Sequence, residues 1–159
     1  MPTLPLAERR LRLLHIEDSD LDHQLILAQL QRAGLRFEVT RLDTLPDIER
    51  ALDQTWDAVI SDYNLPGFSG LVVLDMIKQR QRVLPFVLVS GEIGEDTAVA
   101  AMRTGASDYL LKNNLARLAP ALLHAIESCE AQLARQEAAA SRCSRACRSR
   151  RCSRCTTSG

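Results

Sequence analysis

Apolar and polar positions alternate in blocks along most of this chain. Short apolar or alternating runs, typical of β-strands, occur at residues 11–16, 37–40, 58–60, 86–89 and 108–111. Segments with apolar residues at helical spacing follow these runs, at residues 20–33, 46–54, 71–78, 98–103 and 120–138. The pattern therefore predicts five strands that alternate strictly with five helices.

Strict alternation with short connections is typical of a parallel sheet that is covered by helices on both faces. Right-handed crossovers leave few topologies for such a chain. We therefore expect an α/β fold with a doubly wound, five-stranded parallel sheet in the flavodoxin-like order 2-1-3-4-5.

The composition of the 159 residues, with 46% hydrophobic and 25% charged side chains, is that of one ordinary globular domain. No apolar run approaches the ~20 residues that a membrane span needs. The N-terminus lacks the basic and apolar regions of a signal peptide. We therefore expect a cytoplasmic protein without a membrane partner.

The formal net charge of zero hides a division of the chain. All 20 acidic residues precede position 140, whereas six of the 20 basic residues and four of the five cysteines follow it. We predict an N-terminal lead-in at residues 1–9, a folded domain with an extended last helix at 10–138, and a Cys-, Arg- and Ser-rich disordered tail at 139–159. Four cysteines leave zinc binding open as an alternative for the tail. Its arginines could touch nucleic acid non-specifically, but no aromatic residue interleaves them, so we expect no specific site.

Polar side chains stand at the ends of four predicted strands. Glu17 and Asp18 follow the first strand, and Asp62, Ser90 and Lys112 end the third, fourth and fifth. In the order 2-1-3-4-5 these four strands are neighbours, ~4.8 Å apart, and their ends meet at the carboxyl edge of the sheet, where such folds bind ligands. We therefore expect the five side chains to converge.

Converging carboxylates repel one another unless a cation neutralises them. Mg²⁺ binds carboxylates, carbonyl oxygens and water, and a carboxylate beside it can attack phosphorus to form an aspartyl phosphate. A hydroxyl and an ammonium can then hold the phosphoryl oxygens. Each residue also has an ordinary structural alternative, such as a loop cap for Asp62 or a solvated surface position for Lys112.

Four motifs stand in order on the matching elements: Ile-Glu-Asp at 16–18, Ser-Asp-Tyr-Asn-Leu-Pro-Gly at 61–67, Val-Ser-Gly at 89–91 and Gly-Ala-Ser-Asp-Tyr-Leu-Leu-Lys at 105–112. Each is weak alone, and their combination is specific. With them, residues 10 to about 138 resemble the receiver domain of two-component response regulators, the CheY-like family. The resemblance implies a phosphoacceptor signalling domain rather than a turnover enzyme, one that catalyses only its own phosphorylation and dephosphorylation.

The resemblance assigns the phosphoacceptor and the metal ligands. Asp62 is the phosphoacceptor. Glu17 and Asp18 form the acidic pair that holds Mg²⁺ together with Asp62 and the backbone carbonyl of Asn64, and Mn²⁺ is an alternative ion. Glu17 stands where the family more often has Asp, and its longer arm can still reach the ion directly or through water.

The resemblance also assigns the residues around the phosphoryl group. Ser90 is the switch hydroxyl, Tyr109 is the aromatic residue that turns inward with it, and Lys112 binds the phosphoryl group. Asn64 and Glu92 occupy the two positions that tune the lifetime of that group.

One further position departs from the family pattern. Asn113 follows Lys112 where the family usually has a proline in a cis peptide. A cis bond without proline costs ~3 kcal/mol, so we expect a different local geometry after Lys112.

The implied partners follow from the same resemblance. A sensor histidine kinase or phosphotransfer protein would donate the phosphoryl group. The face formed by the fourth helix, the fifth strand and the last helix would then control a partner, a second copy in a homodimer, or an output domain that follows in the native gene. None of His15, His23 and His124 has catalytic or ligand spacing, so we do not expect a histidine kinase.

Two other functions remain as alternatives. Phosphatases of the haloacid-dehalogenase class also use an aspartyl phosphate, but they want a second Asp two residues after the nucleophile, where this chain has Asn64. A degenerate receiver that acts only as a docking module is the third hypothesis. The complete set of site residue types counts against it.

Overall fold

The computed structural model describes residues 4–6, 8–91 and 94–149, with side chains described up to residue 142. In chain order the elements are β1 (Arg10–Ile16), α1 (Asp20–Arg32), β2 (Arg36–Leu42), α2 (Leu45–Ala51), β3 (Ala58–Asp62), β4 (Asn64–Leu65), β5 (Phe68–Ser69), α3 (Gly70–Gln79), β6 (Phe86–Ser90), α4 (Glu95–Thr104), β7 (Asp108–Leu111), the 3₁₀-helix η1 (Lys112–Arg117) and α5 (Leu118–Ser149). Within these described ranges, we find no helix with the length and apolar character that a membrane crossing requires.

Five strands form one parallel sheet in the order β2-β1-β3-β6-β7. Once the short strands β4 and β5 are set aside, this order is the predicted 2-1-3-4-5, so the predicted fold is confirmed. β4 and β5 pair with each other in a small antiparallel hairpin, where the sequence predicted only a loop. Its turn contains Gly67 at φ +83°, a left-handed conformation that glycine adopts without strain.

The register of the sheet brings the strand ends to one edge. Ser61 of β3 lies opposite Ile16 of β1, so Asp62 and the residues after Ile16 leave the sheet together. Ser90 of β6 lies opposite Leu111 of β7, directly before Lys112. The polar residues that end the strands therefore share the carboxyl edge.

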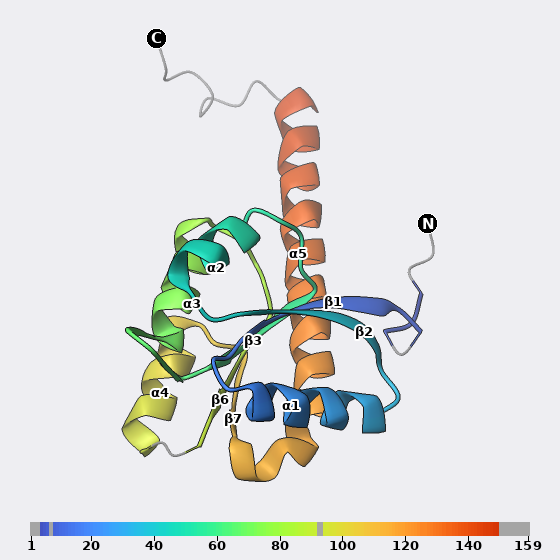
Figure 1. Ribbon diagram of the computed structural model, residues 1–159. Coiled ribbons are helices and arrows are strands. Elements are labelled where there is room, and N and C mark those ends of the chain that lie inside the picture. The colour runs from blue at the N-terminus through green and yellow to red at the C-terminus, as the bar shows by residue number, and fades with distance from the viewer. Residues whose placement is uncertain (1–3, 7, 92–93, 150–159) are drawn as a thin grey trace.

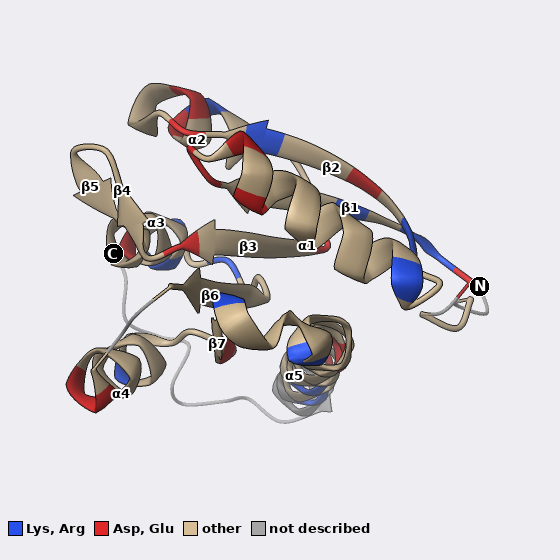
Figure 2. Ribbon diagram, turned by 60° about the horizontal axis from the view of Figure 1, so that its bottom comes forward, with Lys and Arg blue, Asp and Glu red and all other residues tan. Residues whose placement is uncertain are grey.

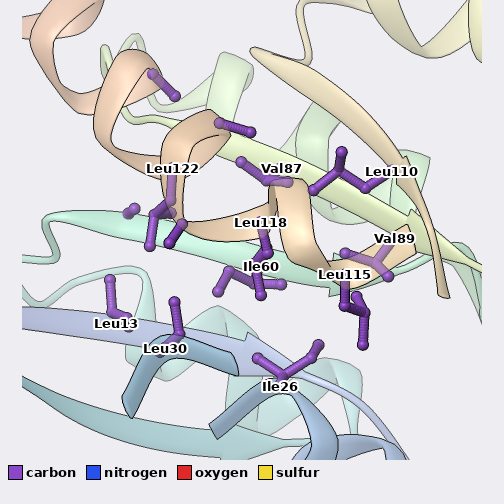
Figure 3. Packing of buried hydrophobic residues seen from close by; sticks show 14 of the residues in the cluster. Leu13, Ile26, Leu30, Ile60, Val87, Val89, Leu110, Leu115, Leu118 and Leu122 are labelled. Atoms are coloured by element: carbon purple, nitrogen blue, oxygen red, sulfur yellow. The ribbon is translucent and has the colours of Figure 1, made fainter. Parts of the chain in front are cut away.

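The side chains of the central strands alternate between two hydrophobic clusters. One cluster packs against α1 and α5, and Figure 3 shows Leu118 and Leu122 of α5 facing Ile60 and Val87 across it. The other cluster lies between the sheet and α2, α3 and α4. Figure 2 shows α1 and α5 on one side of the sheet and α2, α3 and α4 on the other. Burial on both faces explains why β3 and β6 are apolar at successive positions.

The last helix extends farther than the sequence predicted. α5 continues to Ser149, past the expected end at residue 138, so the first part of the predicted disordered tail is helical. Figure 1 shows this helix crossing the sheet and projecting beyond it. The Arg9 guanidinium lies 2.5 Å from a Glu130 oxygen and 3.2 Å from an Asp57 oxygen, and so ties α5 to the start of β3. The predicted domain boundaries stay a prediction, and residues 150–159 lie outside the described residues.

Replacement of Gly70 by Ala is expected to destabilise the fold. A Cβ at this position would lie 2.5 Å from the Asp62 carbonyl oxygen and 2.7 Å from Leu88 Cδ1. Overpacking of this kind lowers the free energy of unfolding by about 1–3 kcal/mol, which urea denaturation can measure. Gly91→Ala is the control, because a Cβ there meets no atom within 4 Å. Equal stabilities for the two variants would contradict the close approach of α3 to β3.

Candidate functional site

Three carboxylates gather at the carboxyl edge of the sheet. Glu17 and Asp18 follow β1, and Asp62 ends β3. One carboxylate oxygen from each lies within 4.8 Å of the other two. Asp18 is exposed, whereas Glu17 and Asp62 are only 1% and 7% exposed. Figure 2 shows acidic positions at the end of β3 and in α1 beside it. Close oxygen ligands of this kind fit a hard divalent cation.

Glu17 is fixed by its backbone and by its side chain. Its amide donates to the Leu42 carbonyl at 3.1 Å, and its Oε1 accepts a hydrogen bond from the Ser19 amide at 3.0 Å. Burial raises the pKa of the Glu17 carboxyl to about 7, and the charge of Asp62 acts in the same direction. The Ser19 amide and Lys112 oppose this rise. Ionisation of this carboxyl is therefore opposed by a desolvation penalty that a bound cation would relieve.

Lys112 lies at the centre of the acids. Its Nζ is 3.0 Å from Asp62 Oδ2, 3.2 Å from Glu17 Oε2 and 2.5 Å from Asp22 Oδ2. Burial by itself would lower the pKa of this ammonium, but hydrogen bonds to Asp22 and Asp62 outweigh it and raise the pKa. Lys112 therefore stays charged and neutralises part of the cluster.

Asp22 is the contact that sequence reasoning missed. It belongs to the first turn of α1, not to a strand end, so the strand-end pattern did not include it. An acid in the first turn of a helix has an ordinary reason to be there, because the helix dipole favours it. Asp22 could have been predicted as a site residue from the proximity in sequence of this turn to Glu17.

Ser90 is the last residue of β6, and Tyr109 lies in the neighbouring strand β7. Ser90 is fully buried at the end of β6. The Tyr109 hydroxyl is also buried and, among the described residues, has no hydrogen-bond partner. Burial raises the pKa of this hydroxyl. Asn64 is exposed in β4, while Glu92 lies outside the described residues, so the proposed roles of these four residues stay predictions.

The chain after Lys112 takes its own geometry. No cis peptide bond occurs in the part of the chain that the structure describes. Lys112 instead opens the 3₁₀-helix η1, in which Asn114 has the non-helical angles φ −133° and ψ 50°. At Asn113, where the family usually has a proline, the chain therefore forms a short irregular helix that leads into α5.

A histidine pair lies on the α1 side of the sheet. His15 Nδ1 and His23 Nδ1 are 2.8 Å apart, so one ring nitrogen donates to the other, and the two rings stack. Burial lowers the pKa of His15 to about 3, and the nearby charges of His23, Lys112 and Arg41 lower it further. His15 is therefore a neutral core residue, in agreement with its place inside a strand.

Comparisons with known proteins identify chains that are similar to this one. The family model of the response regulator receiver domain matches residues 13–123. The transcriptional regulator NtrC of Escherichia coli is 37% identical over 81 residues, which are 50% of this chain and 17% of NtrC. This chain therefore spans a small part of that relative's length.

Solved structures share the fold. A response regulator receiver domain protein from Clostridium thermocellum superposes with a TM-score of 0.66 at 27% identity, over 77% of this chain and 98% of that one. The beryllofluoride-activated NtrC4 receiver domain, solved as a dimer, gives a TM-score of 0.63 at 25% identity, over 74% of this chain and 98% of that one.

Replacement of Glu17 by Gln is expected to stabilise the metal-free protein at high pH. Because the folded-state pKa of Glu17 lies near 7, above its ordinary 4.5, the folded state binds more protons between these values, and stability falls as the pH rises through them. Glu17→Gln should remove this slope and add on the order of 2 kcal/mol at pH 8. Urea denaturation with a chelator at pH 5 and pH 8 measures both effects.

The control for this variant is Glu49→Gln, which removes an exposed carboxylate from α2. It should leave the pH dependence of unfolding unchanged. A Glu17→Gln protein that is less stable than the parent at pH 8 would refute the assigned pKa shift.

Proposed function

This chain belongs to the family of response regulator receiver domains, and we propose that it accepts a phosphoryl group on Asp62. The observation that carries the proposal is the position of the Asp62 carboxylate, within the three-acid cluster and 3.0 Å from the Lys112 ammonium. The family consists of signalling domains. We therefore propose that the phosphoryl group on Asp62 acts as a switch and not as an intermediate of a turnover reaction.

The proposed donor is a phosphohistidine of a sensor histidine kinase or phosphotransfer protein. An Asp62 carboxylate oxygen forms the bond to phosphorus as the phosphorus–nitrogen bond breaks, and the electron pair of that bond returns to the imidazole. Mg²⁺, held by Glu17, Asp18, Asp62 and the Asn64 carbonyl, would supply neutralising charge for the phosphoryl oxygens. Lys112 pairs with one of these oxygens, and Ser90 donates to another.

The proposed readout is the face formed by α4, β7 and α5. A groove of about 570 Å³ opens on it between α4, β7 and η1. Val99 and Met102 line this groove and are 49% and 48% exposed, an apolar pair at helical spacing. Tyr109 also lines it and lies in β7, the strand that ends at Leu111, directly before Lys112. The NtrC4 receiver domain, solved as a dimer, supports a second copy as one partner, and we propose that this copy binds on the α4–β7–α5 face. An output domain is the other proposed target.

The alternative phosphatase function requires a general acid two residues after the nucleophile. Asn64 stands two residues after Asp62, and an amide does not titrate, so it cannot protonate a leaving group. The described site offers Lys112 beside Asp62 instead. This arrangement favours holding the phosphoryl group over hydrolysing a substrate.

Incubation with acetyl phosphate and Mg²⁺ is expected to label Asp62. The adduct should be stable in acid and cleaved by hydroxylamine, as an acyl phosphate is, and intact-mass measurement detects it. Asp62→Ala should abolish the label, because it removes the nucleophile. Asp75→Ala, which removes an exposed carboxylate from α3, should retain it. Labelling that persists in Asp62→Ala would sink the assignment.

Met102→Glu is expected to prevent dimerisation on activation. A charge in the groove of α4 would be desolvated in the dimer interface, and one such buried charge typically weakens association tenfold or more. Light scattering with and without beryllofluoride measures the mass. Val72→Glu is the matched control, since Val72 is a 41% exposed residue of α3. Equal dimer fractions for the two variants would exclude this face as the interface.

A further inference from the structure

Lys112 has one acidic partner that the cation cluster does not share. Its Nζ contacts Glu17, Asp62 and Asp22, and the shortest of the three distances, 2.5 Å, is to Asp22 Oδ2. Glu17 and Asp62 also belong to the three-acid cluster, whereas Asp22 does not. Any cation in that cluster therefore competes with Lys112 for two of its three partners and leaves the third untouched.

The same cation would also repel the ammonium. Two positive charges that both contact the carboxylates of Glu17 and Asp62 lie a few ångströms apart, in a partly buried site where screening is weak. Lys112 would then move away from the cluster unless another anion retained it. Asp22 is the anion in contact, and it lies on α1, whereas the cluster acids lie directly after β1 and at the end of β3.

Asp22 is itself well anchored. Its amide hydrogen bonds to Ser19 Oγ at 3.4 Å in the N-cap of α1, and the positive end of the helix dipole favours its charge. The Asp22 and Lys112 side chains are 28% and 22% exposed, so the ion pair is partly shielded from water. An ion pair of this kind, with one fixed partner, can hold the other partner in a defined place.

We propose that Asp22 is a positioning residue for phosphoryl transfer: it holds the Lys112 ammonium at the mouth of the site when a divalent cation occupies the acidic cluster, so that Lys112 meets the arriving phosphoryl oxygens. This inference rests on the proposed phosphorylation of Asp62. Asp22 touches neither the phosphoryl group nor the cation in this scheme, and its effect passes through Lys112.

The first measurement follows Lys112 itself and needs no phosphorylation. In ¹⁵N-labelled protein with Mg²⁺, the side-chain ammonium of Lys112 should give a resonance that exchanges slowly with water, because its protons are hydrogen-bonded. Asp22→Asn should abolish this resonance, Asp22→Glu should restore it in part, and Asp20→Asn should keep it. Asp20 is the matched control, because it lies in the same helical turn but pairs with Arg41.

The second measurement is the rate of labelling by acetyl phosphate, at Mg²⁺ concentrations where the rate no longer rises. Saturation separates a positioning effect from a weaker affinity for Mg²⁺. Asp22→Asn should lower this rate roughly tenfold, the usual effect of losing one hydrogen bond between charged groups. Asp22→Glu should recover part of the loss, and Asp20→Asn should stay within about twofold of the parent.

The outcomes separate the two proposals. A parent protein that takes no label overturns the proposed function, and with it the role of Asp22 in transfer. A labelled parent whose saturated rate is unchanged in Asp22→Asn overturns this inference alone. A Lys112 resonance that survives in Asp22→Asn with Mg²⁺ present also overturns it, because another group would then hold the ammonium.

Discussion

The balance between buried carboxylates and one ammonium is the constraint on which the rest of this structure depends. Glu17 and Asp62 are almost fully buried beside each other, and Lys112 is the cation that reaches both. Burial raises the pKa of Glu17 to about 7, so the folded protein carries this acid at a cost in stability. A site that served stability alone would have an apolar side chain here. The acids instead create a place where added positive charge and phosphoryl oxygens are favourable.

The sheet supplies the geometry that this balance needs. Parallel strands in adjacent register bring residues that are far apart in sequence to one edge, and the two hydrophobic clusters hold that edge from both faces. Gly70 lets the start of α3 pass close to the Asp62 carbonyl, where any Cβ would collide. The 3₁₀-helix η1 then turns the chain directly after Lys112 into α5. The ammonium is therefore held by the strand before it and by the helix after it.

The sequence predicted the parts of the site that follow from periodicity. Short apolar or alternating runs with an abrupt polar end identify Glu17, Asp62, Ser90 and Lys112, because the carboxyl ends of parallel strands lie at one edge of the sheet. The contact from Asp22 depends on how α1 is rotated against the sheet, which its pattern of apolar residues does not define to within one side chain. The β4–β5 hairpin and the added length of α5 escaped prediction for another reason. Two-residue strands and an Ala-rich extension carry little hydrophobic pattern.

The elements around the site differ in how firmly they are held, and this difference indicates where a charge change can act. α3 buries four residues against the sheet, whereas Ala101 is the one residue of α4 that is buried. Local stability follows buried apolar contact, so α4 can move for less free energy than its neighbours. α5 starts at η1 beside the site, packs through Leu118 and Leu122, and is tied again by Arg9 at Glu130. A shift of Lys112 and β7 should therefore be relieved at α4 and its apolar groove, before it displaces the long helix as a whole.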